Sequence, residues 1–371
     1  MNDCKGADRQ PCCRPEVGKA HWNGSGLSQG DGMRAFFYSR PDTLAAVVRA
    51  PPHSRYLAGG TSLIDLMKVD VERPEHVINI KALSLDAIEP LPDGGLRLGA
   101  LTTNARTAAH PLVRTNYPIL ASALLAGASA RIRHVATNGG NINQRTRCHY
   151  FYDTNAACNK RAPGTGCAAR GTRNRVHAIL GTSADCIAAF PSDMCVVLAM
   201  LDATINLYGP QGARRVHARD YHRLPGGTPW LETVLRPGEL VLSIDLPPIS
   251  FGSHYTYLKI RDLNVLALAV VSVAVGLEMD GDVIRHGRVA LGGVASRPWY
   301  VPEVEGMLCG RRPSRSLFRD VADRLMQGAE VDRGNAAKRT LAPRVIQHAL
   351  WQAATASPQP DGNLPVWSCS D

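Results

Sequence analysis

The sequence has no apolar run long enough to cross a membrane and no recognisable export signal. Its longest apolar run, Val265–Leu277, has thirteen residues, whereas a membrane helix needs about 20. Many residues of this run are β-branched, which favours a buried strand. The N-terminus also lacks the continuous apolar segment of a secretory signal. We therefore predict no membrane span and no signal peptide of its own.

Motifs for nucleic-acid and common nucleotide binding are missing as well. The formal net charge of +10 would suit a nucleic-acid partner, but no basic-aromatic RNA motif, zinc-finger spacing or helix-turn-helix signature is present. Neither G-x-G-x-x-G nor the Walker pattern occurs, so a Rossmann fold or a P-loop is not indicated. We expect no nucleic-acid partner.

The chain of 371 residues is too long for one compact core and predicts two or three folded units. Helices and strands alternate up to the double proline Pro247–Pro248, a plausible domain boundary, and an antiparallel pattern follows. The sequence thus predicts an α+β fold. The segments 1–32 and 357–371 lack apolar periodicity and are predicted to be disordered tails, which makes Met33 an alternative start.

Individual elements can be predicted from apolar periodicity and turn residues. Predicted strands include Ser54–Leu57, His76–Ile80, His177–Gly181, Leu240–Leu246, Tyr255–Arg261, Val265–Leu277 and Val283–Val294. Predicted helices include Asp42–Arg49, Leu63–Lys68, Thr103–His110, Ile119–Ala130, Ser192–Leu201, Ser314–Met326 and Ala336–Ala354. Hairpin turns are expected at Gly209–Gly212 and at Asp280–Gly281.

Two glycine loops are candidates for binding an anion. AGGTSL at Ala58–Leu63 lies between a predicted strand and a helix, and TNGGNIN at Thr137–Asn143 follows a helix. Paired glycines let the backbone approach a ligand and expose consecutive N–H groups. Such a loop beside a helix N-terminus suits a pyrophosphate. Taken alone, two tight turns explain these segments equally well.

Five cysteines lie within 48 residues, at Cys148, Cys158, Cys167, Cys186 and Cys195. No two of them form the C-x2–4-C pair that is typical of a structural zinc site. Disulfides would leave one cysteine over. Cys195 lies just inside a predicted helix on an apolar stripe, which indicates ordinary packing.

The charge around the other four cysteines favours an iron–sulfur cluster. Asp153 is the only acid between positions 145 and 175, where the sequence has seven basic residues, Arg145, Arg147, Lys160, Arg161, Arg170, Arg173 and Arg175. Basic neighbours would offset the negative charge of a [4Fe–4S] centre and lower the pKa of its cysteines. A solvated basic loop with idle thiols is the alternative on spacing and charge alone.

Six motifs occur in the order found in one family: YLAGGTSLIDLMK, LGALTT, ATNGGNIN, PSDM, YLKIR and LGGVASRP. In this order they resemble the FAD-binding medium subunits of the xanthine dehydrogenase, or molybdenum hydroxylase, family. The resemblance implies a vanillyl-alcohol-oxidase-type FAD-binding domain of two α/β subdomains at about 33–250. A C-terminal domain like that of the carbon-monoxide-dehydrogenase flavoprotein would follow at about 251–356.

The resemblance also implies which residues bind the cofactors, with no catalytic residue in this chain. The FAD pyrophosphate would lie against Ala58, Gly59, Gly60, Thr61, Ser62 and Leu63, and against Thr137, Asn138, Gly140 and Asn141. Leu101 and Thr102 would lie along the FAD, Asp193 would bond its ribityl or ring-proximal part, and Lys259 would place a positive charge nearby. The insertion at about 145–190 is similar to that of bacterial three-subunit aldehyde oxidoreductases, which implies a [4Fe–4S] cluster on Cys148, Cys158, Cys167 and Cys186.

The implied function is electron transfer within a larger enzyme, a molybdenum-dependent aldehyde oxidoreductase. Its partners would be a large molybdenum-cofactor subunit and a small subunit with two [2Fe–2S] clusters. Alternatives are the flavin subunit of a xanthine dehydrogenase or of 4-hydroxybenzoyl-CoA reductase, a self-sufficient flavin oxidase, and a basic zinc-binding interaction protein. We expect a cytoplasmic location, or a periplasmic one if the chain is exported folded with a signal-bearing partner.

Overall fold

The computed structural model describes residues 18–19, 33–249, 251–262 and 268–357. The two predicted tails therefore lie almost wholly outside the described residues. Within the first tail, Gly18–Lys19 form strand β1, which pairs antiparallel with β2 at Phe37–Ser39. An open edge strand can bond an extended segment through its backbone, and the predicted disorder of the first tail stays a prediction.

The first unit is a small sheet with the strand order β1-β2-β4-β3. Strand β4 runs parallel to both β2 and β3. Two short helices connect the parallel strands, as such crossovers require. The bounds are α1 Leu44–Val48, β3 Ser54–Leu57, α2 Leu63–Lys68 and β4 His76–Asn79.

The second unit combines helices with an antiparallel sheet of the order β5-β6-β9-β7-β8. Its strands are β5 Ile88–Pro90, β6 Leu96–Gly99, β7 Thr204–Gly209, β8 Gly212–His217 and β9 Leu240–Leu246. Its helices are α3 Asn104–Ala109, α4 Pro111–Asn116, α5 Pro118–Ala126, α6 Ala130–Arg133, α7 Asn138–Ile142, α8 His149–Tyr152, α9 Asp193–Leu201 and α10 Ala218–Tyr221.

The third unit is an antiparallel sheet in sequential order, β10-β11-β12-β13, covered by helices on one face. The strands are β10 Tyr255–Ile260, β11 Val271–Asp280, β12 Val283–Gly292 and β13 Trp299–Tyr300. The helices are α11 Glu303–Leu308, α12 Arg315–Leu325 and α13 Ala337–Ala354.

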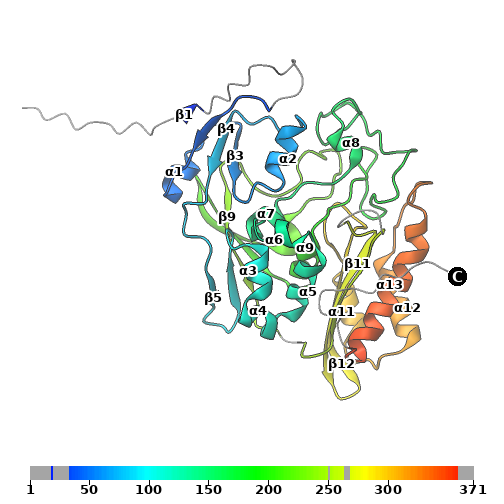
Figure 1. Cartoon of the computed structure of the whole chain (residues 1–371). Coiled ribbons are helices and arrows are strands. Elements are labelled where there is room, and N and C mark those ends of the chain that lie inside the picture. The colour runs from blue at the N-terminus through cyan, green and yellow to red at the C-terminus, as the bar shows by residue number, and fades with distance from the viewer. Residues whose placement is uncertain (1–17, 20–32, 250, 263–267, 358–371) are drawn as a thin grey trace, which may run out of the picture.

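Helix α9 lies between the two larger sheets, in the middle of the molecule (Figure 1). All nine of its residues, DMCVVLAML, are buried. A helix that is apolar on every side needs such a fully enclosed position. Strand β11 is buried on both faces over its first seven residues, because α9 packs on one face and α13 packs on the other.

Most predicted elements are found near their expected positions, and three predictions are wrong in part. His177–Gly181 is not a strand: Ile179 and Leu180 both donate their N–H groups to the carbonyl of Val294, outside any ladder. Helix α5 ends at Ala126 because Gly127 follows as its C-cap. The strand predicted at Val265–Leu277 begins only at Val271 and continues to Asp280, and residues 263–267 lie outside the described residues.

Candidate functional site

The loop Ala58–Leu63 leads from β3 into α2 and presents a row of free backbone donors. Gly60 has φ +78°, a conformation that favours glycine. Within the described part of the chain, the N–H groups of Gly59 to Leu63 have no acceptor. Successive N–H groups beside a helix N-terminus form a concavity that attracts an anion.

A second glycine segment packs directly behind this loop. A Cβ at Gly59 would collide with the carbonyl oxygen of Val135, so the two loops can touch only because residue 59 is glycine. The chain then enters α7, whose N-cap Thr137 accepts a hydrogen bond from Gly140 N–H at 3.1 Å.

The N–H groups of this second segment are already used within the protein. Asn138 N–H donates to Thr102 O, Gly139 N–H to Ala100 O, and Asn141 N–H to Thr137 O. The prediction of consecutive exposed N–H groups at TNGGN is therefore wrong, because the segment forms a capped helical turn. Gly140 is the exposed residue of this turn.

Buried amides and hydroxyls hold the second segment in place. Asn138 is fully buried and donates to Gly99 O and to the hydroxyl of Thr107. The hydroxyl of Thr102, a predicted FAD contact, donates instead to Asp86 O at 2.9 Å. Both side chains are thus bonded inside the protein, while the half-buried Leu101 beside them remains accessible.

Asp193 forms a buried ion pair with Lys259. Lys259 Nζ lies 2.7 Å from one carboxylate oxygen, and Tyr257 donates its hydroxyl to the other at 2.5 Å. The Lys259 side chain is 0% exposed, so it is not a surface charge. Burial and the Asp193 carboxylate raise the pKa of Tyr257 well above its ordinary value. The cap of α9 is Ser192, not Asp193.

The four predicted cysteine ligands line one small cavity in the insertion. Its wall includes Cys148, Cys158, Cys167 and Cys186, with Phe151 and other apolar side chains between them. Cys148 is the N-cap residue of α8. The backbones of Cys158 and Cys167 pair in an isolated antiparallel β-bridge. All four thiols are free. Cys195 lies elsewhere, buried in α9.

For Cys148 and Cys186, the basic residues of the insertion do not produce the predicted lower pKa. Burial raises the pKa of Cys148 to about 12, and it also raises that of Cys186, although Lys160 opposes the latter shift. A metal that binds Cys148 and Cys186 must therefore displace their protons. The prediction is wrong because desolvation outweighs the nearby positive charge.

Acids from distant parts of the chain pair with several of these basic residues. Arg145 pairs with Glu72 and Glu232, and Lys160 also pairs with Glu232 at 2.9 Å. Arg175 pairs with Asp262. Arg161 and Arg170 donate to carbonyl groups of the insertion. The local excess of positive charge is therefore smaller than the sequence suggests.

The four cysteines do not converge on a single metal ion. Among the described residues, no group of three or more His, Cys, Asp or Glu side chains is arranged to hold one metal ion. A [4Fe–4S] cluster binds each thiolate to a different iron, so its ligands stand farther apart than those of one ion. Four thiols line this cavity, which is the number of thiolates that a [4Fe–4S] cluster takes.

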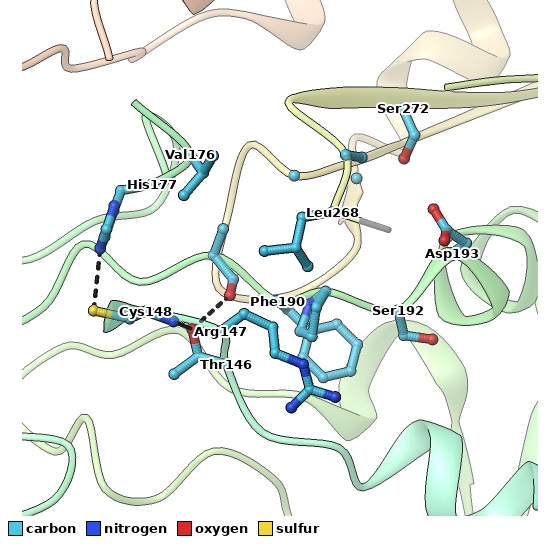
Figure 2. Close-up of a pocket in the computed structure, with 15 residues that line it drawn as sticks. Thr146, Arg147, Cys148, Val176, His177, Phe190, Ser192, Asp193, Leu268 and Ser272 are labelled. Atoms are coloured by element: carbon cyan, nitrogen blue, oxygen red, sulfur yellow. Dashed lines mark hydrogen bonds between the residues drawn. The ribbon is translucent and has the colours of Figure 1, made fainter. Parts of the chain in front are cut away.

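A second cavity extends from Cys148 to Asp193 and brings the two regions together. It is lined by His177 and Phe190 between them, and by Ser192 beside Asp193. Figure 2 shows His177 directed at Cys148 on one side of the cavity, with Asp193 on the opposite side. His177 Nε2 lies 3.1 Å from Cys148 Sγ. Sequence reasoning missed His177, because only the fold brings it to a cysteine 29 residues away.

Two domain families match this chain. Residues 34–249 match the family described as the FAD binding domain in molybdopterin dehydrogenase, and residues 253–353 match the CO dehydrogenase flavoprotein C-terminal domain. The chain belongs to this family of FAD-binding subunits. It is therefore a flavoprotein subunit of the oxidoreductases known as molybdenum hydroxylases, and the predicted family and α+β fold class are confirmed.

Curated relatives and solved structures agree with this assignment. The flavoprotein is 45% identical over 325 residues to the aldehyde oxidoreductase FAD-binding subunit PaoB of Escherichia coli K12, covering 86% of this chain and 99% of that protein. It is 27% identical to the carbon monoxide dehydrogenase medium chain of Afipia carboxidovorans, over 86% of this chain and 96% of that one. The quinoline 2-oxidoreductase structure from Pseudomonas putida 86 shares its fold, with TM-score 0.67 and 23% identity over 88% and 99% of the two chains.

Among the helices that the structure describes, none is long and apolar enough to cross a membrane.

Proposed function

We propose that this flavoprotein is the FAD- and [4Fe–4S]-containing electron-transfer subunit of a molybdenum-dependent aldehyde oxidoreductase. It would receive electrons from a large molybdenum-cofactor subunit, through a small subunit with two [2Fe–2S] clusters, and pass them to an external acceptor. The 45% identity to an aldehyde oxidoreductase FAD-binding subunit supports this substrate class over that of the xanthine dehydrogenase subunits, which are 25% identical.

The FAD would be bound mainly by the loop Ala58–Leu63. Its free N–H groups offer donors for the pyrophosphate, and the exposed Gly140 and half-buried Asn141 of the adjoining segment would complete this site. Asp193, oriented by Lys259 and Tyr257, would accept a hydrogen bond from the ring-proximal part. Thr102, Thr137 and Asn138 would act indirectly, because their polar groups already hold the loops together.

The single observation that carries the cluster proposal is that four cysteines from one insertion surround one cavity. These are Cys148, Cys158, Cys167 and Cys186. When bound, FAD and an iron–sulfur cluster supply the two-electron and one-electron chemistry that side chains lack. The protein would hold the thiolates in an apolar wall, and Lys160 would place a buried positive charge beside Cys186.

Iron, sulfide and flavin analysis of the purified complex tests the proposal with two matched cysteine variants. Cys186→Ala should lose about four irons per complex and keep most of its FAD. Cys195→Ala should keep the wild-type iron content, because Cys195 packs inside α9, at a modest cost in stability.

The two variants test separately whether a cluster is present and which cysteines bind it. Equal iron contents in wild type, Cys186→Ala and Cys195→Ala would remove the cluster from this subunit. Loss of iron from Cys195→Ala alone would mean that a cluster is present but that the assigned ligands are wrong.

A further inference from the structure

His177 lines the cavity that reaches Asp193 and contacts Cys148, which also lines the cysteine cavity. Its side chain is buried, and its Nε2 lies 3.1 Å from Cys148 Sγ (Figure 2). It lines the same cavity as Asp193. His177 is thus in direct contact with Cys148, the cysteine that lines both cavities.

The hydrogen bonds of His177 indicate which ring nitrogen carries the proton. Nδ1 is buried and has no partner among the described residues. An N–H group there would be a buried unpaired donor, which costs more than an unpaired lone pair on a neutral ring. A cysteine thiolate can only accept a hydrogen bond. With Cys148 as a metal ligand, the proton must therefore be on Nε2, directed at the sulfur.

The C-terminal unit holds this histidine in place through the backbone. Lys338 on α13 donates its buried ammonium group to His177 O at 2.7 Å and to Gly293 O at 2.6 Å. Asn335 donates to the next carbonyl, Ala178 O, at 3.0 Å. His177 N–H is itself bonded to Asn174 O. The backbone at His177 is therefore set before any cluster binds, and the Cys148 contact directs the ring.

We propose that His177 is a positioning residue that donates a hydrogen bond from Nε2 to the Cys148 thiolate and raises the reduction potential of the cluster. The inference rests on the cluster proposed above. A donor at a ligand sulfur stabilises the added negative charge of the reduced cluster more than it stabilises the oxidised form. No proton is transferred, because His177 keeps its Nε2 proton in both oxidation states.

The test is a redox titration of the whole complex, followed by electron paramagnetic resonance of this subunit's cluster. His177→Leu removes the donor and keeps an apolar side chain of similar length. At a fixed solution potential, its ratio of reduced to oxidised cluster should fall about tenfold, equal to a potential about 59 mV lower for one electron. His177→Gln retains an amide donor and should recover part of this change.

Tyr150→Phe is the matched control. Tyr150 lines the cysteine cavity, but its hydroxyl bonds Thr172 and Arg173 and no cysteine. This variant should titrate like wild type. Wild-type potentials in both His177→Leu and His177→Gln, with full iron content, would overturn the role of His177 and leave the cluster proposal intact. Absence of iron from the wild-type subunit would instead remove the cluster proposal itself.

If His177→Leu loses its cluster, a spectroscopic measurement on proteins that keep the cluster tests the same hydrogen bond. With ¹⁵N-labelled histidine, the electron spin of the reduced wild-type cluster should show a magnetic coupling to one nitrogen of a histidine ring. The coupling should persist in His149→Gln, the variant of the exposed neighbour of Cys148, and disappear in His177→Gln. A coupling that disappeared only in His149→Gln, or was absent from wild type, would refute the inference.

Discussion

Asp193, Lys259 and Tyr257 bring two charges and a hydroxyl into a region where most side chains are apolar. A charge taken out of water is costly unless a partner at close range and further hydrogen bonds compensate. Here the carboxylate bonds both partners, and the ammonium group also donates to Ala126 O at 3.1 Å. The ion pair thereby fixes the direction of the carboxylate beside the cavity.

Lys259→Met should destabilise the protein by about 3–5 kcal/mol, because it leaves the Asp193 charge buried without its partner. Urea unfolding of the purified chain measures this change. The double variant with Asp193→Asn should cost less than the sum of the two single variants. The exposed Lys81→Met should change the free energy of unfolding by no more than about 0.5 kcal/mol. An equally small change in Lys259→Met would show that the buried Asp193 charge does not depend on Lys259 for its compensation.

His222 makes the stability of the protein depend on pH. Burial lowers its pKa to about 4, whereas an unfolded histidine titrates near 6.5. Between these values the unfolded chain binds more protons than the folded chain, so stability is complete above about pH 6.5 and is lost as the pH falls towards 4. The loss from this residue is about 3 kcal/mol at most.

His222→Gln should reduce this acid sensitivity, because glutamine does not titrate and can still donate to Ile142 O, which His222 approaches at 2.8 Å. Urea unfolding at pH 7 and pH 4.5 compares the two proteins. His286→Gln, on the exposed part of β12, serves as the control and should keep the wild-type pH dependence. Equal acid sensitivity in His222→Gln and wild type would contradict the assignment to His222.

At the scale of secondary structure, the two glycine segments Ala58–Leu63 and Thr137–Asn143 depend on each other for their shape. The loop between β3 and α2 keeps its donors free, while the segment that enters α7 uses its own donors to pack against β6 and α3. One segment is therefore available to a ligand and the other supports it. The closest approach between them is at Gly59, where the carbonyl of Val135 leaves no room for a Cβ.

Gly59→Ala should separate the two segments, lower the stability by about 1–3 kcal/mol and weaken FAD binding. Flavin content after gel filtration, together with the thermal unfolding midpoint, measures both effects. Gly306→Ala is the matched control: it lies inside α11 with open space around it, so it should gain up to about 1 kcal/mol from helix propensity and keep its FAD. Full flavin retention in Gly59→Ala would argue against the loop as the pyrophosphate site.

For the molecule as a whole, the cysteine insertion is held from two sides. The first unit contacts it through Glu72, which pairs with Arg145. The C-terminal unit contacts it through Asp332, which accepts from Gly171 N–H and from Asn174, and through Asp262, which pairs with Arg175. The insertion therefore lies where both units meet, and the cavity beside it ends at the α9 carboxylate of Asp193.

The purified chain, loaded with FAD, should show no flavin reduction by any aldehyde, because we assign aldehyde oxidation to the molybdenum-containing partner. Anaerobic absorption spectra of the flavin after mixing with substrate measure this. Adding the partner subunits should restore reduction. Turnover by the lone chain would support a self-sufficient flavin oxidase instead.

Local sequence alone determined the elements whose signals are short-range. The glycine turn at Gly281, with φ +58°, set the β11–β12 hairpin, and the apolar residues that follow Asp193 predicted the helix at Ser192–Leu201. The six motifs, taken in their order along the chain, were sufficient to identify the family. These features depend on backbone conformation and on the period of apolar residues, which neighbouring residues fix.

Tertiary structure alone decided the electrostatics of the candidate sites. The partners of Arg145 are 73 and 87 residues away, and Lys338 reaches the carbonyl of a residue 161 positions earlier. No local pattern reveals such pairs, so the charge around the cysteines was overestimated and His177 was missed. Burial, which raises the pKa of the thiols and hides Lys259 from water, is likewise a property of the packed chain, because it depends on which distant segments exclude the solvent.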